Sequence, residues 1–146
     1  KIPILLSSNT SIGINLMNDL VSKMAENLNG FDIEIIETHH NKKVDSPSGT
    51  AKTLFNIINE TFENKMRLIN GREGNHKRDK NEIGIHSIRG GSVVGEHRVI
   101  FYGDDETIEI KHSAMSKKIF VYGAIKSAKF LIGKKPNLYG MKDVLS

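Results

Sequence analysis

Two histidines and a lysine lie close together in the middle of the chain, at His39, His40 and Lys43. Imidazole gains and loses a proton near neutral pH, and a lysine ammonium is a proton donor or a fixed cation. The Ser-Gly-Thr run that follows, Ser48 to Thr50, is typical of a helix start, where backbone N–H groups lack helical partners and the helix dipole is positive. A carboxylate or phosphate binds well there. Residues 37–51 therefore indicate acid–base chemistry on an anionic ligand.

A strand and a helix are expected to position these residues. Residues 31–35 alternate apolar and polar side chains, as a half-buried strand does, and apolar side chains recur at helical spacing over residues 48–63. The charged run between them, residues 37–51, is predicted to be a loop held by packed elements at both ends. Such a loop is free to display reactive side chains.

Less specific interpretations of the same residues remain open. Adjacent histidines are often two exposed polar side chains, and a loop lysine is often only solvated. A cation beside the positive end of a helix dipole is, however, unfavourable unless an anion binds between them. Metal binding is not expected, because the chain has six histidines but no cysteine, and no histidine pair has the helical spacing of a zinc motif. His86, His97 and His112 fall in strand patterns and are expected to be partly buried and hydrogen-bonded.

The rest of the chain predicts further elements in order. A strand at residues 1–6 leads through a polar cluster into a helix that ends at Asn29 and Gly30, with Leu20 on its apolar face. A short strand at 66–69 and a polar loop at 70–81 precede three runs with a period of two, at 83–89, 93–101 and 107–112, which predict an antiparallel meander. A last helix, at 117–132, leads into an apolar tail and carries on one face Phe120, Ala124, Ala128 and either Leu131 or Ile132.

Composition limits the class of protein. The 146 residues suit one domain, and the net charge of +4 comes from 21 basic and 17 acidic residues that are interspersed. This favours a small anionic ligand over a nucleic-acid track, although a non-catalytic anion- or nucleic-acid-binding module with its basic stretch at 72–80 stays the alternative. No apolar run reaches the roughly 20 residues that span a bilayer, and no signal peptide is evident. We expect a cytoplasmic protein with no membrane or nucleic-acid partner.

The central stretch is long enough to be compared with known families. Its order of residues, Glu37-Thr38-His39-His40, then Lys43, then Asp45 to Ala51, resembles the signature of the dihydrodipicolinate reductases, enzymes of the diaminopimelate pathway of lysine biosynthesis. The resemblance extends to residues 8–13, 89–91, 94–97, 108–112, Phe120 and 123–124, and so covers nearly the whole chain.

The resemblance implies an α+β fold with a mixed, largely antiparallel sheet, helices on one face, and a homotetramer built through the sheet. In that family an N-terminal Rossmann domain binds NADH or NADPH, and this sequence resembles only the part that follows. Residues 1–10 would be the hinge strand and cofactor-contacting segment, and 11–113 the substrate-binding and tetramerisation domain. Residues 114–146 would form a helix and tail that return to the nucleotide-binding domain and pack on it.

The resemblance also implies an activity, the NAD(P)H-dependent reduction of hydroxytetrahydrodipicolinate, a cyclic dicarboxylate, to tetrahydrodipicolinate. This chain would supply substrate binding and proton donation and would be inactive alone. Thr10 stands where the family often has a bulky apolar residue, and Lys117 near a family arginine, which weakens the transfer of cofactor contacts. The implied roles are general acid/base for His39, proton donor for Lys43, substrate binding for His40, Ser48, Gly49 and Thr50, and cofactor contact for Ser7, Ser8, Asn9 and Thr10.

Overall fold

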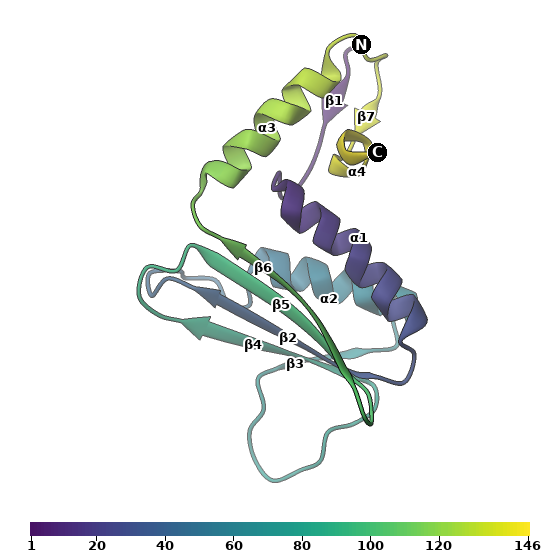
Figure 1. The fold of residues 1–146 in the computed structure, drawn as a ribbon, viewed down its shortest axis with the longest axis vertical. Coiled ribbons are helices and arrows are strands. Elements are labelled where there is room, and N and C mark those ends of the chain that lie inside the picture. The colour runs from purple at the N-terminus through teal and green to yellow at the C-terminus, as the bar shows by residue number, and fades with distance from the viewer.

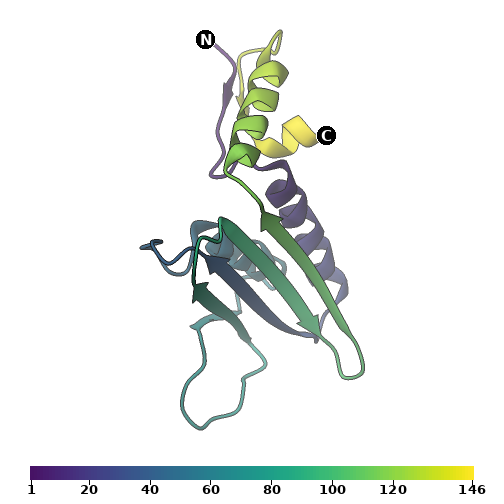
Figure 2. The same cartoon turned by 60° about the vertical axis from the view of Figure 1, so that its left-hand side comes forward.

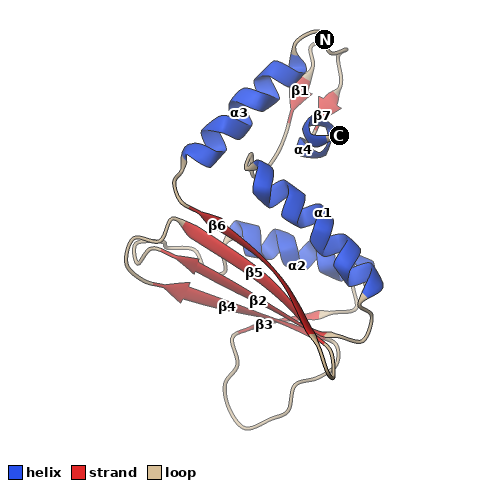
Figure 3. Cartoon of the chain, viewed as in Figure 1, coloured by secondary structure: helices blue, strands red, loops and turns tan.

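The computed structural model describes residues 1–146 and contains one five-stranded sheet, one two-stranded sheet and four helices (Figures 1 and 3). Helices α1 and α2 cover one face of the large sheet, so the α+β class predicted from the sequence is confirmed. The strands are β1 (Ile4–Leu5), β2 (Asp32–His39), β3 (Arg67–Asn70), β4 (Glu82–Arg89), β5 (Gly95–Tyr102), β6 (Thr107–Ala114) and β7 (Leu138–Tyr139), and the helices are α1 (Ile12–Asn27), α2 (Gly49–Thr61), α3 (Lys118–Leu131) and α4 (Met141–Leu145).

The hydrophobic core lies between the large sheet and helices α1 and α2. Burial alternates along β2, because successive side chains of a strand point to opposite faces. Ile33 and Ile35 point into the core, and the next two residues with that orientation are Glu37 and His39, both buried. The face of β2 that packs in the core is therefore apolar along most of the strand and polar at its carboxyl end.

The order of strands in the large sheet is β3-β4-β2-β5-β6. β2 pairs parallel with β4 and antiparallel with β5, and β5 pairs antiparallel with β6. The meander predicted for residues 83–112 is therefore wrong between β4 and β5, which do not pair because β2 lies between them. Half of the strand pairings are parallel, so the sheet is mixed but not largely antiparallel.

Residues 90–94 connect β4 to β5 by passing over the carboxyl end of β2. The Gly90 amide donates a hydrogen bond to the His39 carbonyl (3.0 Å), and the Asn41 amide donates one to the Gly91 carbonyl (3.2 Å). Gly91 has φ +50°, a left-handed conformation that glycine adopts without a Cβ penalty. The connection thereby fixes the backbone on both sides of His40.

Side-chain caps set the start of the two core helices. Ser11 accepts a hydrogen bond from the Ile14 amide at the start of α1, and Ser48 accepts one from the Ala51 amide at the start of α2. The sequence predicted both starts. The apolar face of α1 differs from the prediction at Leu20, which is 40% exposed, whereas Ala25 is buried.

The second unit of the fold joins both ends of the chain. Strands β1 and β7 pair in parallel, and α3 and α4 lie beside them, above the large sheet in Figures 1 and 2. Helix α3 is buried through Gly123 and Ser127, not through Phe120, Ala124 and Ala128 as predicted. The reason is close approach: a Cβ on Gly123 would overlap the carbonyl of Thr10. Only glycine lets α3 pack this tightly on the segment that follows β1.

The face of the sheet opposite the helices carries a network of charged residues. Glu34 of β2 accepts hydrogen bonds from Arg72 and Arg78, which lie in the loop between β3 and β4, and it contacts His86 of β4. Glu82 is buried and binds Arg72 as well. The two arginines of the basic stretch at 72–80 are thus paired with carboxylates of the same chain.

No helix is both long and apolar enough to cross a membrane.

Candidate functional site

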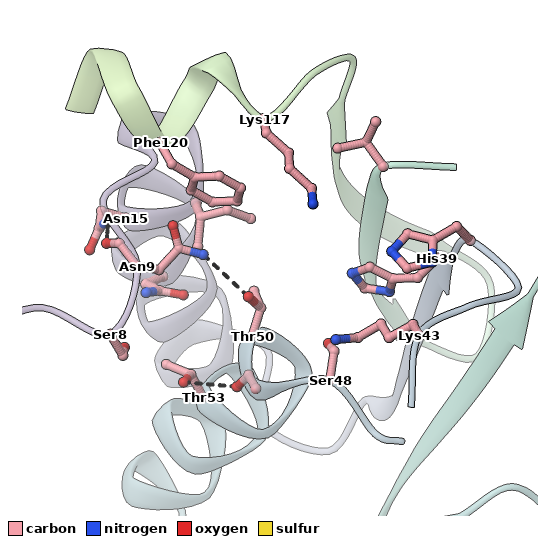
Figure 4. A pocket seen from close by; sticks show the side chains of 15 residues that line it. Ser8, Asn9, Asn15, His39, Lys43, Ser48, Thr50, Thr53, Lys117 and Phe120 are labelled. Carbon is pink, nitrogen blue, oxygen red and sulfur yellow. Dashed lines mark hydrogen bonds between the residues drawn. The ribbon is translucent and has the colours of Figure 1, made fainter. Parts of the chain in front are cut away.

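A cavity of about 390 Å³ lies where the first turns of α1, α2 and α3 converge beside the end of β2 (Figure 4). Gly49 and Thr50, at the positive end of the α2 dipole, line the cavity, whereas α1 and α3 contribute side chains to it. No carboxylate is among its lining residues. The site is therefore built for an anion. Its lining consists of Ser8, Asn9, Ile14, Asn15, Asn18, His39, His40, Lys43, Ser48, Gly49, Thr50, Thr53, Val94, Lys117 and Phe120.

His39 lies at the end of β2, not in a loop as predicted, because the strand continues through Glu37, Thr38 and His39. The His39 Nδ1 lies 2.6 Å from the Glu37 Oε2, and the Nε2 atom on the opposite side of the ring has no such partner. A Cβ on Gly95 would lie 3.0 Å from that Nε2 atom. Gly95 therefore leaves room for the ring, and the sheet gives the imidazole a fixed orientation.

Glu37 is fully buried beneath the cavity. Arg89 donates two hydrogen bonds to its carboxylate, at 2.8 and 2.7 Å, and the Ser48 amide donates a third at 3.1 Å. Burial raises the pKa of the Glu37 carboxyl, but the hydrogen bonds from Arg89, His39 and the Ser48 amide outweigh burial and lower the pKa to about 2. Glu37 is therefore a carboxylate at neutral pH, and it accepts every one of these hydrogen bonds.

His97 lies on β5 behind His39. The two rings meet edge to face, with centroids 5.2 Å apart, and the His97 Nε2 lies 3.0 Å from the Ser48 Oγ. Burial, with the nearby His39, lowers the pKa of His97 to about 4. Neutral His97 accepts a hydrogen bond from the Ser48 hydroxyl through Nε2, and the Ser48 Oγ in turn accepts a hydrogen bond from the Ala51 amide as the helix cap. His97 is hydrogen-bonded as predicted, and it is buried more completely than the partial burial that we expected.

His112, next to His97 on β6, departs from the same prediction. It is partly buried, but its Nδ1 atom has no hydrogen-bond partner. Burial lowers its pKa. His86, by contrast, is partly buried and lies 2.7 Å from a Glu34 oxygen through its Nε2, as predicted.

Lys43 and Lys117 are the two lysines of the cavity, and they come from opposite sides (Figure 4). The Lys43 Nζ lies 2.6 Å from the Asp45 Oδ1, so the ammonium has a carboxylate partner within its own loop. That partner is 58% exposed, which leaves the cation open to a stronger anionic ligand. The unfavourable position expected for Lys43 near the helix dipole is relieved in part by Asp45.

The start of α2 supplies hydrogen-bond donors to the cavity. Gly49 and Thr50 occupy the first two helical positions, whose amide N–H groups have no acceptor within a helix. A Cβ on Gly49 would meet no atom within 4 Å, so the space above its backbone is open. The predicted substrate residues His40, Ser48, Gly49 and Thr50 all line this one cavity.

The predicted cofactor-contacting residues, 7–10, only partly reach the cavity. Ser8 and Asn9 line it, whereas Ser7 and Thr10 do not. Asn9 donates to the Thr50 hydroxyl (3.3 Å) and accepts from the Ser11 amide (2.8 Å), and Thr10 donates to the Phe120 carbonyl (2.9 Å). The Ser7 hydroxyl donates to the Asn9 carbonyl (2.7 Å). These side chains hold the segment in place, and the Ser8 hydroxyl is the group left free for a ligand.

Other residues of the site had no role assigned from the sequence. Lys117 and Phe120 enter from the start of α3, and Asn15, Asn18 and Thr53 come from the sides of α1 and α2. Their residue types carry no distinct signal, because amides and hydroxyls are common on exposed helix faces. Arg89 carried one signal, a basic residue directly before a Gly-Gly pair at a strand end.

The comparisons with known proteins agree with this geometry. A family model described as dihydrodipicolinate reductase, C-terminus, matches residues 13–145. The 4-hydroxy-tetrahydrodipicolinate reductase of Brachyspira hyodysenteriae is 71% identical over 99% of this chain, and that of Caldanaerobacter subterraneus subsp. tengcongensis is 53% identical over 99% of it. The chain spans 63% and 58% of the length of these two relatives.

One solved structure is similar to most of the chain. The dipicolinate-bound dihydrodipicolinate reductase from Paenisporosarcina sp. TG-14 superimposes with a TM-score of 0.75 at 27% identity, and the match covers 97% of this chain and 54% of that one. Sequence and fold point to the same group of proteins. The chain therefore belongs to the dihydrodipicolinate reductase family and corresponds to its C-terminal part.

Proposed function

We propose that this chain binds the dicarboxylate substrate and supplies the proton in the NAD(P)H-dependent reduction of hydroxytetrahydrodipicolinate to tetrahydrodipicolinate, in which the substrate hydroxyl leaves as water. The observation that carries the proposal is the cavity itself. It joins His39, Lys43 and the start of α2 at one place, without a lining carboxylate. A dianion is the ligand that this distribution of charge favours.

The residues divide the work by their position. The free N–H groups of Gly49 and Thr50, with the Thr50 hydroxyl, receive one carboxylate of the substrate, and Lys43 and Lys117 provide opposing cations for the other. The Lys43 Nζ donates a proton to the substrate atom on which negative charge develops during reduction. The His39 Nε2, on the side of the ring away from Glu37, exchanges a proton with the bound substrate.

A nicotinamide cofactor, when bound, supplies the hydride for this reduction. The fit to this chain is partial: Ser8 and Asn9 lie at the cavity, but the side chains of Ser7, Asn9 and Thr10 are engaged in internal hydrogen bonds. We propose that residues 1–10 form the hinge segment that meets the nicotinamide, with the Ser8 hydroxyl as its contact. The rest of the dinucleotide, NADH or NADPH, is bound by the part of the family's length that this chain does not span.

The binding part of the proposal is tested by calorimetry with pyridine-2,6-dicarboxylate. Lys43→Ala should weaken binding by about 10-fold or more, because a charge-assisted hydrogen bond contributes about 1.5–3 kcal/mol. Thr50→Val, which keeps the shape and removes the hydroxyl, should weaken it by about 5-fold. Lys42→Ala is the matched control, since Lys42 is exposed and does not line the cavity.

Two outcomes would refute this assignment. One is the absence of binding by the unchanged protein, and the other is an equal loss of affinity in Lys42→Ala and Lys43→Ala. A general effect of net charge would produce the second result, whereas a directed contact would not.

We also propose that the face of the large sheet opposite α1 and α2 mediates a homotetramer. Ile88 and Tyr102 on that face are 51% and 42% exposed, although they lie in strands of the sheet. Residues 114–146 would then remain available to pack on a nucleotide-binding domain. Light scattering at micromolar concentration tests the first statement, and a mass equal to one subunit would contradict it.

A further inference from the structure

The buried carboxylate of Glu37 contacts both His39 and the start of α2, to which the proposed function gives different roles. The Glu37 Oε2 lies 2.6 Å from the His39 Nδ1, and the Glu37 Oε1 accepts the Ser48 amide at 3.1 Å. The side chain of Glu37 is fully buried, so it does not reach the ligand itself. Its position connects the acid–base imidazole to the start of α2, where the ligand carboxylate is received.

Arg89 extends this connection to the lysine. Its guanidinium binds both oxygens of Glu37 and also donates to the Asp45 carbonyl at 2.8 Å. Asp45 holds the Lys43 ammonium through its side chain. A lysine in place of Arg89 could not make these contacts together, because a planar guanidinium presents several donors in a fixed fork and an ammonium does not.

We propose that Glu37 and Arg89 form a positioning pair that fixes the tautomer of His39 and holds the Lys43 loop and the start of α2 in one arrangement. This inference rests on the proposed function for the roles of His39 and Lys43. The tautomer of His39 does not depend on that function. An ionised Glu37 can only accept hydrogen bonds, so neutral His39 carries its proton on Nδ1 and leaves Nε2 unprotonated.

The chain contains its own matched control for the pair. Glu34 lies on the same strand but on the opposite face, where it also binds arginines, Arg72 and Arg78, and a histidine, His86. A substitution of Glu34 therefore removes the same kinds of contact from the same strand. It differs from Glu37 in lying away from the cavity.

The first measurement is NMR of the chain labelled with ¹⁵N-histidine, with the imidazole nitrogens of His39 assigned through a His39→Gln variant. In the unchanged protein at pH 8, His39 should show a protonated Nδ1 and an unprotonated Nε2. Glu37→Gln should give a mixed tautomer, because an amide presents both a donor and an acceptor to Nδ1. Glu34→Gln should leave His39 unchanged. A His39 protonated on Nε2 in the unchanged protein, or unaltered in Glu37→Gln, overturns the inference.

The second measurement is steady-state kinetics of the full-length protein, which includes the nucleotide-binding part. Glu37→Gln should lower kcat by at least about 10-fold with KM changed by less than about 3-fold, because orientation of a general acid–base is lost while the ligand contacts remain. Glu34→Gln should keep kcat within about 2-fold of the unchanged protein. Equal losses in the two variants would show a structural role only, and would overturn the proposal.

Arg89→Lys keeps the inference testable if Glu37→Gln does not fold. It preserves the charge that balances Glu37 and loses the contact with the Asp45 carbonyl, so pyridine-2,6-dicarboxylate affinity should fall about 10-fold with the His39 tautomer retained. Unaltered affinity would contradict the coupling to the Lys43 loop. Failure of the unchanged protein to bind this dicarboxylate would refute the proposed function, whereas the His39 tautomer would still decide the role of Glu37.

Discussion

The contact between Gly123 and Thr10 gives a sharp test of how the two units of the fold are joined. A Cβ on Gly123 would overlap the Thr10 carbonyl oxygen and lie 2.6 Å from its carbonyl carbon. Carbon atoms prefer separations of about 3.5–4.0 Å, so Gly123→Ala forces the helix and the segment apart by at least about 1 Å. Both contacted atoms belong to the backbone, which cannot rotate aside as a side chain would.

Two opposing energies decide the outcome of Gly123→Ala. Alanine is favoured over glycine within a helix by about 1 kcal/mol. Forced separation costs about 1–3 kcal/mol, and loss of the bond from the Thr10 hydroxyl to the Phe120 carbonyl costs about 1 kcal/mol more. The substitution should therefore destabilise the chain by about 2 kcal/mol, which lowers Tm by roughly 4–8 °C.

Urea and thermal unfolding followed by circular dichroism measure this change. Ala124→Gly is the matched control, because Ala124 is the next residue of α3 and is exposed, so it should lose only the helix propensity of about 1 kcal/mol. Since Phe120 and Lys117 line the cavity from the same helix, Gly123→Ala should also weaken dicarboxylate binding, whereas Ala124→Gly should not. A stabilised Gly123→Ala would refute the close packing.

Two further predictions concern acid stability and Lys117. Because the folded state holds the pKa of His97 at about 4, against an ordinary value near 6.5, the unfolded state alone takes up its proton between these values, so stability should fall by up to about 3 kcal/mol as pH drops from 6.5 to 4. Urea titrations at several pH values should show a smaller fall of the unfolding free energy in His97→Gln than in the unchanged protein. The exposed-loop control His76→Gln should behave like the unchanged protein, and the same dependence on pH in both variants would contradict the assignment. Lys117→Ala should weaken pyridine-2,6-dicarboxylate binding about 10-fold in calorimetry, and the exposed neighbour Lys118→Ala should not; equal affinities in both would exclude Lys117 from the site.

The sequence was most informative where local rules decide the structure. The start of α1 followed from the polar cluster before it and the start of α2 from Ser48, since a hydroxyl before an apolar periodic run caps the first amides of a helix. The core face of β2 followed from its alternation at Ile33 and Ile35. The predicted substrate residues also follow one another closely in the chain, so their convergence in one cavity needs little long-range information.

The sequence was least informative where distant segments meet. A connection of residues 90–94 is short enough for a hairpin and long enough to pass over one strand, because neighbouring strands are only about 4.8 Å apart. Nothing local shows that β2 lies between β4 and β5. The packing of Gly123 on Thr10 likewise places Lys117 at the cavity, and the spacing of apolar residues in α3 does not predict this contact.

The central position of β2 has a consequence for the order in which the protein acquires its site. Glu37 and Arg89 are 52 residues apart in the chain, and the partner strands of β2 both follow it by a long interval. Contacts between distant residues must overcome the entropy of closing long loops, and they slow folding. During synthesis β2 must wait, unpaired, until β4 and β5 have left the ribosome. The imidazole of His39 is therefore oriented only when the sheet is nearly complete, so a half-made chain has the reactive residues but not yet the site.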